Sequence, residues 1–389
     1  MREAFIYDGV RTPFGHYGKS LAASRPDDLL AGVFTAILER NPSLDPASLG
    51  DVIAGNANGA GEENRNVARM SSLLAGIPTS VPGVTVNRLC GSSMEAVIQA
   101  RRAIACGEAE TVLVGGVESM SRAPWVVPKP ERAFPAAASE MYSTTLGWRM
   151  VNPSMPSKWA ISLGGSAEKL ADIYGISREA QDAFAAQSHH RAAAAWQDGI
   201  YAAQTVAAAG ATLARDEAIR DDTSAEALAG LRPAFRQDGT VTAGNSSPLS
   251  DGASALLVGA EGTVDAEPLA RIVSTASTGN DPDVFGIAPV DAMELAVERA
   301  GISWGDVVQV EINEAFASQV LACLSLMPHV DPGLVNPHGG AIAIGHPLGA
   351  SGGRLISHLA HSLRARGGGY GVAGICIGVG QALAVVLEG

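Results

Sequence analysis

Residues 86–104 read VNRLCGSSMEAVIQARRAI, and TVLVGG follows at 111–116. The apolar spacing within the first stretch predicts a helix, and the second stretch predicts a buried strand. The last third of the chain repeats this order, with VNPHGG at 335–340, GASGGRLISHLAHSL at 349–363 and YGVAGIC at 370–376. Each copy has Val-Asn, a turn of small residues, a helix and an apolar strand that contains glycine. The sequence therefore predicts an α/β fold built from two pseudo-symmetric halves.

The segment between these copies has a different character. Six prolines between Pro124 and Pro156 exclude regular structure over much of that stretch. Long insertions of this kind often carry substrate contacts. We expect an N-terminal half at 1–120, completed by about 246–268, an inserted loop or lid domain at 121–245, and a C-terminal half at 269–389.

The composition excludes several classes of protein. Of 389 residues, 47% are apolar and 17% charged, which suits a buried core and not a disordered chain. A net charge of −13 argues against a nucleic-acid partner, although local groups can still bind a small anion. Four widely spaced cysteines favour a reducing cytoplasm, and the start of the chain has no secretory signal. The uncharged stretch 370–387 is broken by glycines, so it predicts two buried strands and not a membrane helix.

Two residues have sequence surroundings that suit catalysis. Cys90 directly precedes the predicted helix, where the peptide dipoles favour a nucleophilic thiolate and the amides could hold an oxyanion. The alternative is a small buried thiol that fills core space. His346 lies in GGAIAIGHPLG at 339–349, and Pro347 keeps it in an extended loop, as suits a general base. The alternative is a histidine bonded to loop carbonyls.

Other polar residues follow predicted strands. Cys376 ends an apolar strand and is either a second acid/base or a buried strand thiol. Asn313 follows a strand at 307–312 and precedes a predicted helix at 314–326; it either caps this helix or donates its carboxamide to an oxyanion or a water. The remaining cysteines and histidines considered are interpreted as structural or surface groups: Cys106, Cys323, His189, His190, His329, His358 and His361. No spacing of His, Cys and Asp predicts a metal site.

Taken together, five sequence blocks resemble the thiolase family. They are NRLCGSS at 87–93, GGVESMS at 115–121, NEAFA at 313–317, GGAIAIGHPLGASG at 339–352 and CIG at 376–378. They stand in the family's order across nearly the whole chain, and the resemblance implies a layered αβαβα thiolase fold. Further stretches, among them GEENRNVARM, TTLGWRMVNP and CIGVGQ, look most similar to 3-oxoadipyl-CoA thiolases. The block after Cys376 departs from the commoner CxGGG form, with Val379 at the middle glycine.

The resemblance also implies a set of catalytic roles. Cys90 would be the nucleophile that becomes acylated, His346 its base, and Cys376 the acid or base at the α-carbon. Asn313 would fix a water that forms one oxyanion site with His346, and the amides of Cys90 and Gly378 would form the other.

Coenzyme A would be a co-substrate, with no permanently bound cofactor and no metal. The resemblance places these residues near it: Arg220, Phe235, Ala243, Ser247, Leu163 and Phe316. For Arg220 the alternative is a surface helix charge paired with Asp221 or Asp222. Ser162 and Leu163 both differ from the residues that short-chain biosynthetic members carry.

The favoured reaction converts a 3-oxoacyl-CoA and CoA into acetyl-CoA and a shortened acyl-CoA. The favoured 3-oxoacyl-CoA is 3-oxoadipyl-CoA. The near alternative is an acetyl-CoA C-acetyltransferase that makes or cleaves acetoacetyl-CoA. A decarboxylating condensing enzyme would carry histidine in place of Cys376, and a hydrolase would not need that thiol. A non-enzymatic thiolase-like lipid carrier would lack Cys90 or His346. By analogy we expect a cytoplasmic homodimer or homotetramer with no nucleic-acid or membrane partner.

Overall fold

A mixed sheet of ten strands runs through the computed structural model, which describes residues 2–389. The strands of its main path follow the order β10-β11-β12-β9-β1-β8-β5-β3-β4, and β2 pairs with β8 beside it. The strands are β1 (Ala4–Arg11), β2 (Gly15–His16), β3 (Asp51–Gly55), β4 (Gly83–Val86), β5 (Thr111–Ser119), β8 (Ser250–Ala260), β9 (Ala270–Gly279), β10 (Val307–Ile312), β11 (Tyr370–Ile377) and β12 (Gln381–Glu388). β6 (Trp125–Val126) and β7 (Tyr142–Ser143) form a separate two-stranded ribbon.

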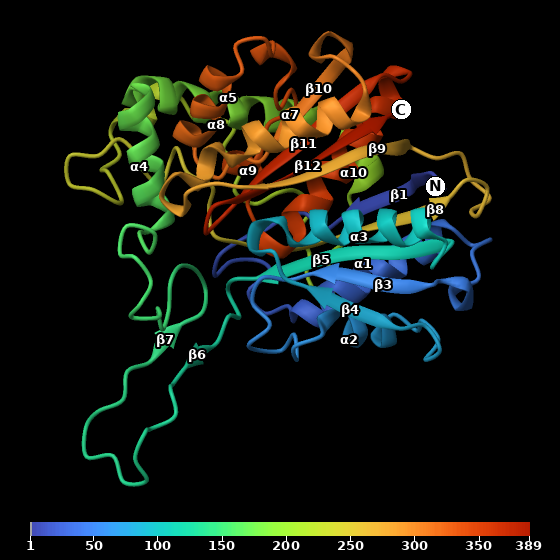
Figure 1. Ribbon diagram of the computed structural model, residues 1–389, viewed down its shortest axis with the longest axis horizontal. Coiled ribbons are helices and arrows are strands. Elements are labelled where there is room, and N and C mark those ends of the chain that lie inside the picture. The colour runs from blue at the N-terminus through green and yellow to red at the C-terminus, as the bar shows by residue number, and fades with distance from the viewer. Residues whose placement is uncertain (1) are drawn as a thin grey trace.

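The helices lie between and outside these strands (Figure 1). They are α1 (Pro26–Arg40), α2 (Val67–Leu74), α3 (Ser92–Cys106), α4 (Leu163–Tyr174), α5 (Arg178–Gln197), α6 (Ala225–Ala229), α7 (Ala288–Ala300), α8 (Ala317–Leu326), α9 (Ala341–Ile344) and α10 (Leu348–Arg366). Among residues 2–389, none of them has the length and apolar character needed to cross a bilayer. The stretch 370–387 forms the antiparallel hairpin β11–β12, as predicted.

The strand pairing shows the internal symmetry. In the first half β3 pairs in parallel with β5, which is followed by antiparallel β8 and β1. In the second half β10 pairs in parallel with β11, which is followed by antiparallel β12 and β9. A short antiparallel contact between β1 and β9 joins the two sets. The repeated Val-Asn has the same place in both halves. Val86 of β4 pairs in parallel with the end of β3, and Val335 makes a parallel bridge to β10.

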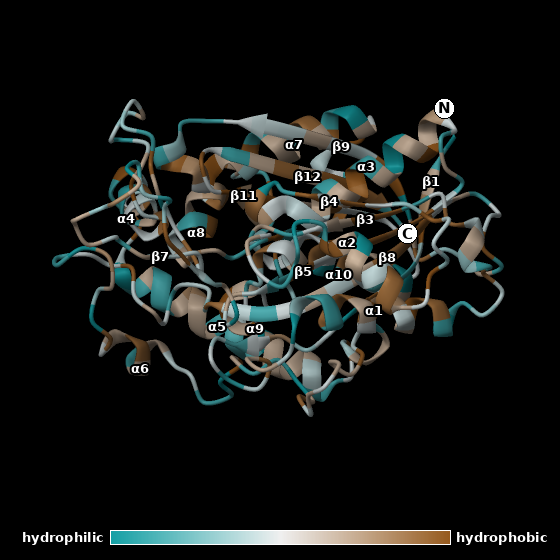
Figure 2. Ribbon diagram, turned by 90° about the horizontal axis from the view of Figure 1, so that it is seen from below, coloured by the Kyte–Doolittle hydropathy of each residue, from teal (hydrophilic) through white to brown (hydrophobic). Residues whose placement is uncertain are grey.

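Three large hydrophobic clusters hold five layers of backbone together. The central layer packs α3 and α10 between the two halves of the sheet, and it contains Met94, Leu355 and Leu383. One outer layer packs α1 against the first half, and the other packs α7 against the second. Figure 1 shows the strands of the first half toward the bottom and those of the second half toward the top, and Figure 2 shows the hydrophobic residues following the inner strands. The predicted fold is confirmed.

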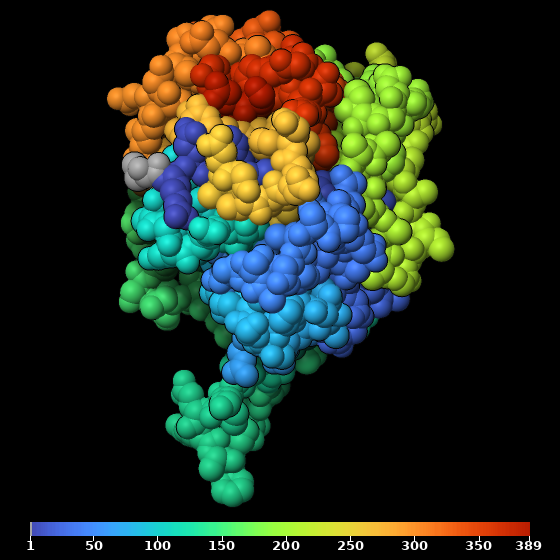
Figure 3. Space-filling model, turned by 90° about the vertical axis from the view of Figure 1, so that its right-hand side faces the viewer, coloured from blue at the N-terminus to red at the C-terminus, as the bar shows by residue number. Residues whose placement is uncertain are grey.

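The inserted segment leaves the body after β5. Residues 124–144, which we call the arm, project from the body as an extended loop with only β6 and β7 as regular structure (Figures 1 and 3). The arm is closed at its base, where the backbone N–H of Thr144 donates to the carbonyl of Pro124. Helices α4, α5 and α6 follow; α4 and α5 pack against α8, and α6 packs against α5.

Candidate active site

A cavity of about 1070 Å³ opens between the body and the inserted segment, and Cys90 and His346 both line it. The six residues that the sequence placed near coenzyme A line the same cavity: Leu163, Arg220, Phe235, Ala243, Ser247 and Phe316. Apolar walls with a few convergent polar groups are typical of small-molecule sites. The fold thus brings residues from both halves and from the insertion to one place.

Cys90 lies in the single 3-10 turn Leu89–Gly91, just before α3 begins at Ser92. Leu89 has a φ of 45°, an unusual value for a residue with a Cβ, and such strain often marks functional sites. The backbone N–H of Gly378 donates to the Cys90 sulfur. Burial nevertheless raises the pKa of Cys90 to about 11, so the thiol is protonated at neutral pH. Burial therefore opposes the thiolate that the position before the helix favours.

His346 is held in one orientation by two serines. Its backbone N–H donates to Ser250 Oγ at 3.1 Å, and its Nδ1 lies 2.6 Å from Ser351 Oγ. The Ser351 hydroxyl donates its proton to the carbonyl of Pro347 at 2.9 Å, so it accepts from Nδ1–H. Nε2 therefore keeps its lone pair. Burial lowers the pKa of His346 to about 3, which leaves a neutral imidazole that can accept a proton.

Asn313 contacts the free side of this ring. Its Nδ2 lies 3.4 Å from Nε2 of His346, and its Oδ1 has no hydrogen-bond partner among the described residues. The alternative that Asn313 caps the following helix is wrong, because α8 begins at Ala317 and the residue in the cap position is Phe316. The predicted helix therefore starts three residues too early.

Cys376 lies on β11, close to the end of the strand, and is 1% exposed. It packs in one apolar cluster with Leu163 and Phe316, and burial raises its pKa well above the ordinary value, with the nearby Cys90 as the next cause. Val379, in the turn between β11 and β12, has a φ of 69°. This left-handed backbone explains why glycine suits the position, and here a β-branched residue adopts it.

The six residues of the coenzyme A prediction form a partly aromatic wall. The rings of Phe235 and Phe316 meet edge to face with centroids 6.0 Å apart. Ser247 Oγ donates to the carbonyl of Ala315 at 3.1 Å. Arg220 is exposed and lies outside any helix, and Asp221 pairs with Arg215. The alternative that Arg220 is a helix charge paired with a neighbouring aspartate is therefore wrong.

Sequence reasoning missed several polar residues of this region. His189 was interpreted as a surface or packing residue, yet it lines the cavity; its Nδ1 accepts from the backbone N–H of Arg220, and burial lowers its pKa to about 4. Glu118 and Glu314 are buried beside the loops that carry the site. They lie in the GGVESMS and NEAFA blocks, so their position in the motifs was the available signal.

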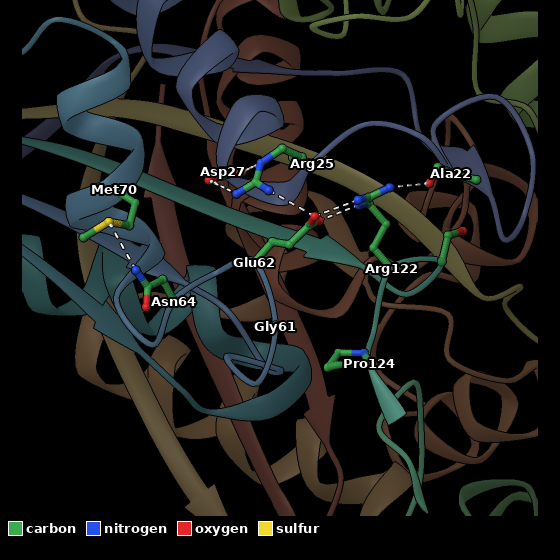
Figure 4. Close-up of a pocket in the computed structure, with 10 residues that line it drawn as sticks. Ala22, Arg25, Asp27, Gly61, Glu62, Asn64, Met70, Arg122 and Pro124 are labelled. Carbon is green, nitrogen blue, oxygen red and sulfur yellow. Dashed lines mark hydrogen bonds and ion pairs between the residues drawn. The ribbon is translucent and has the colours of Figure 1, made fainter. Parts of the chain in front are cut away.

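A second pocket of about 580 Å³ lies at the base of the arm (Figure 4). Glu62 links Arg25 at 3.0 Å and Arg122 at 2.5 Å, so the charges in this pocket largely satisfy one another. Within residues 2–389, no three His, Cys, Asp or Glu side chains are grouped to share a metal ion.

Comparison with known proteins gives the class of the protein. Residues 4–262 match the thiolase N-terminal domain and residues 266–389 match the thiolase C-terminal domain. The structure of human mitochondrial 3-ketoacyl-CoA thiolase superposes with a TM-score of 0.93 at 38% identity, covering 100% of this chain and 98% of that one. The same human enzyme in complex with CoA gives 0.92 at 38% identity, with the same coverage. The chain belongs to the thiolase family and is an acyltransferase.

Relatives at higher identity have narrower names. The 3-oxoadipyl-CoA/3-oxo-5,6-dehydrosuberyl-CoA thiolase of Escherichia coli K12 is 48% identical over 405 residues, covering 100% of both chains. The beta-ketoadipyl-CoA thiolase of Pseudomonas aeruginosa is also 48% identical, over 398 residues, covering 100% of this chain and 99% of the relative.

Proposed function

We propose that this thiolase cleaves 3-oxoadipyl-CoA with CoA, giving acetyl-CoA and a four-carbon acyl-CoA that ends in a carboxylate. The observation that carries the chemistry is that the Cys90 thiol and a neutral His346 imidazole line one cavity, with the buried thiol of Cys376 near Cys90. Breaking a carbon–carbon bond next to a carbonyl needs a nucleophile, a base for it and an acid for the departing carbanion. His346, Cys90 and Cys376 supply that set.

In the first step His346 takes the proton of Cys90, and the sulfur attacks the 3-oxo carbon of the substrate. The bond between C2 and C3 breaks, its electron pair remains on C2, and Cys376 protonates that carbon to form acetyl-CoA. The acyl group stays on Cys90. The Cys90 thiol keeps its proton in the resting site, so negative charge develops only during the attack, when the substrate takes up that charge.

In the second step free CoA gives its thiol proton to Cys376 and attacks the acyl group on Cys90. The Cys90 sulfur leaves and recovers its proton from His346, so every group returns to its starting state. The amides of Cys90 and Gly378 would hold the oxygen of the acyl group, and Gly378 already donates to the sulfur. Asn313 and a water would hold the thioester oxygen with His346.

The substrate assignment rests on the relatives and on the cavity. Two relatives at 48% identity are named for 3-oxoadipyl-CoA or beta-ketoadipyl-CoA, and a structure similar to this chain was solved with CoA. Lys19 and Arg220 line the cavity and supply cationic groups for an anionic ligand, although the net charge of the chain is −13. We further propose a homodimer or homotetramer that acts in the cytoplasm.

Rates on three substrates test this assignment. With 3-oxoadipyl-, 3-oxohexanoyl- and acetoacetyl-CoA, we expect the highest kcat/KM for 3-oxoadipyl-CoA, and Cys90→Ala should abolish cleavage of all three. Higher kcat/KM on acetoacetyl-CoA would support the acetyltransferase alternative. Full turnover by Cys90→Ala would overturn the nucleophile assignment.

A further inference from the structure

Glu118 lies at the end of β5 and is 2% exposed, yet the proposed reaction does not use it. Its carboxylate accepts three backbone hydrogen bonds from two separate segments. Oε2 accepts from Ala57 at 3.0 Å and from Gly349 at 2.9 Å, and Oε1 accepts from Asn58 at 3.1 Å. A buried carboxylate held in this way fixes the segments that donate to it.

The first of these segments supports the nucleophile. Asn87 Nδ2 donates to the carbonyl of Ala57 at 2.9 Å, and Asn87 Oδ1 accepts from the backbone N–H of Leu89 at 2.9 Å. Leu89 is the strained residue directly before Cys90. A short path of hydrogen bonds thus connects Glu118 with the turn that presents the thiol.

The second segment supports the base. Gly349 lies in the first turn of α10, three residues after His346 and two before Ser351, which fixes the imidazole. The end of β5 approaches this turn so closely that a Cβ on Gly349 would lie 2.2 Å from the carbonyl oxygen of Val117. Only glycine fits this approach, and it brings the Gly349 N–H to the carboxylate.

We propose that Glu118 is a positioning residue that fixes the position of the Cys90 turn relative to the His346 loop. Cys90 comes from the first half of the molecule and His346 from the second, so no single element sets their separation. The inference rests on the proposed use of these two residues in acyl transfer. Proton transfer between them requires near-ideal geometry, and a displacement of about 1 Å can cost on the order of 100-fold in rate.

The variant Glu118→Gln tests this role with little change of shape. Its NH2 group would face either the Asn58 N–H or the N–H groups of both Ala57 and Gly349, so at least one of the three donors loses its acceptor. We expect kcat for thiolysis to fall on the order of 100-fold with KM for CoA within about twofold. The alkylation rate of Cys90 by iodoacetamide at neutral pH, followed on its peptide by mass spectrometry, should fall in parallel. Alkylation needs no acyl substrate, so it tests the geometry even if the proposed substrate is wrong.

Glu63→Gln is the matched control. Glu63 is also 2% exposed and lies near Glu118, but it accepts from Gly61 and, among residues 2–389, makes no hydrogen bond to the His346 loop. We expect wild-type kcat and alkylation from this control. Glu118→Asp keeps the charge, is one methylene shorter, and should show an intermediate loss; it replaces Glu118→Gln if that variant does not fold. Wild-type kcat and alkylation in a folded Glu118 variant, or equal losses in the Glu63 control, would overturn the proposal.

Discussion

At the scale of single residues, burial controls the chemistry more than local charge does. The pKa of Cys90 rises to about 11 and that of His346 falls to about 3, so both groups are neutral when the site is empty. In the proposed reaction, the proton of Cys90 passes to His346 only when the substrate is bound. A protonated thiol is also less open to oxidation than a thiolate, which protects an enzyme that waits for substrate.

The variant Cys376→Ser separates the two half-reactions. A serine hydroxyl is a much weaker acid than a thiol, so cleavage of 3-oxoacyl-CoA should fall at least about 100-fold. Exchange of the acyl group between acetyl-CoA and labelled CoA should persist, because Cys90 and His346 remain. Cys323→Ser is the control, since Cys323 is also fully buried and donates to the carbonyl of Gly286. Equal loss of exchange and cleavage would count against an acid/base role for Cys376.

The sequence points to Cys90 and His346 through the glycine-rich loops around them, and to Cys376 only through the resemblance to thiolases. It could not reveal their protonation states, which depend on what packs over them. His189 shows the same limit. Two adjacent histidines on a helix look like a surface pair, and only the folded chain shows that the first faces the cavity.

At the scale of elements, buried charges fix the loops that connect the layers. Glu314 shows why α8 begins later than the apolar spacing predicts: its carboxylate accepts from Ser188 Oγ at 2.6 Å, Asn336 Nδ2 at 2.9 Å and the Ile342 N–H at 3.1 Å. These bonds hold the chain extended before the helix. Sequence periodicity predicts the interior of a helix well, but it does not predict a helix start that hydrogen bonds from distant residues determine.

A buried ion pair joins β1 to the insertion. Both guanidinium ends of Arg11 bind Asp216, at 2.6 and 2.8 Å, and neither side chain is exposed. Asp216→Ala leaves a buried cation without its partner, so unfolding in urea should show a loss of about 3–5 kcal/mol. Asp221→Ala removes an exposed partner of Arg215 and should cost about 0–1 kcal/mol. Similar losses in both variants would contradict this account of the pair.

At the scale of the whole molecule, the insertion has two parts with different relations to the cavity. Residues 146–148, 160 and 162–164 line it, whereas the arm extends away from the body. Ligand binding should therefore order one part and leave the other as it is. Composition and prolines predicted an insertion here, but no sequence signal distinguished the arm from the cavity wall.

Limited digestion with trypsin measures this difference. CoA at saturation should slow cleavage after Arg149 and Lys158, which flank the cavity wall, several-fold. Cleavage after Arg132 in the exposed arm is the internal control and should keep its rate. Equal protection at all three sites, or none at any, would show that CoA binds elsewhere or changes the whole molecule.

The position of β8 has a consequence for how the chain is made. This strand lies between β1 and β5, yet it follows them only after the entire insertion has been added. During synthesis the first half therefore leaves the ribosome with β1 unpaired and with one edge of β5 free, and it stays so until residues 250–260 emerge. Pairings over such sequence separations form slowly. The nascent chain is thus most exposed to aggregation before its middle third is complete, and chaperone demand should be greatest in that interval.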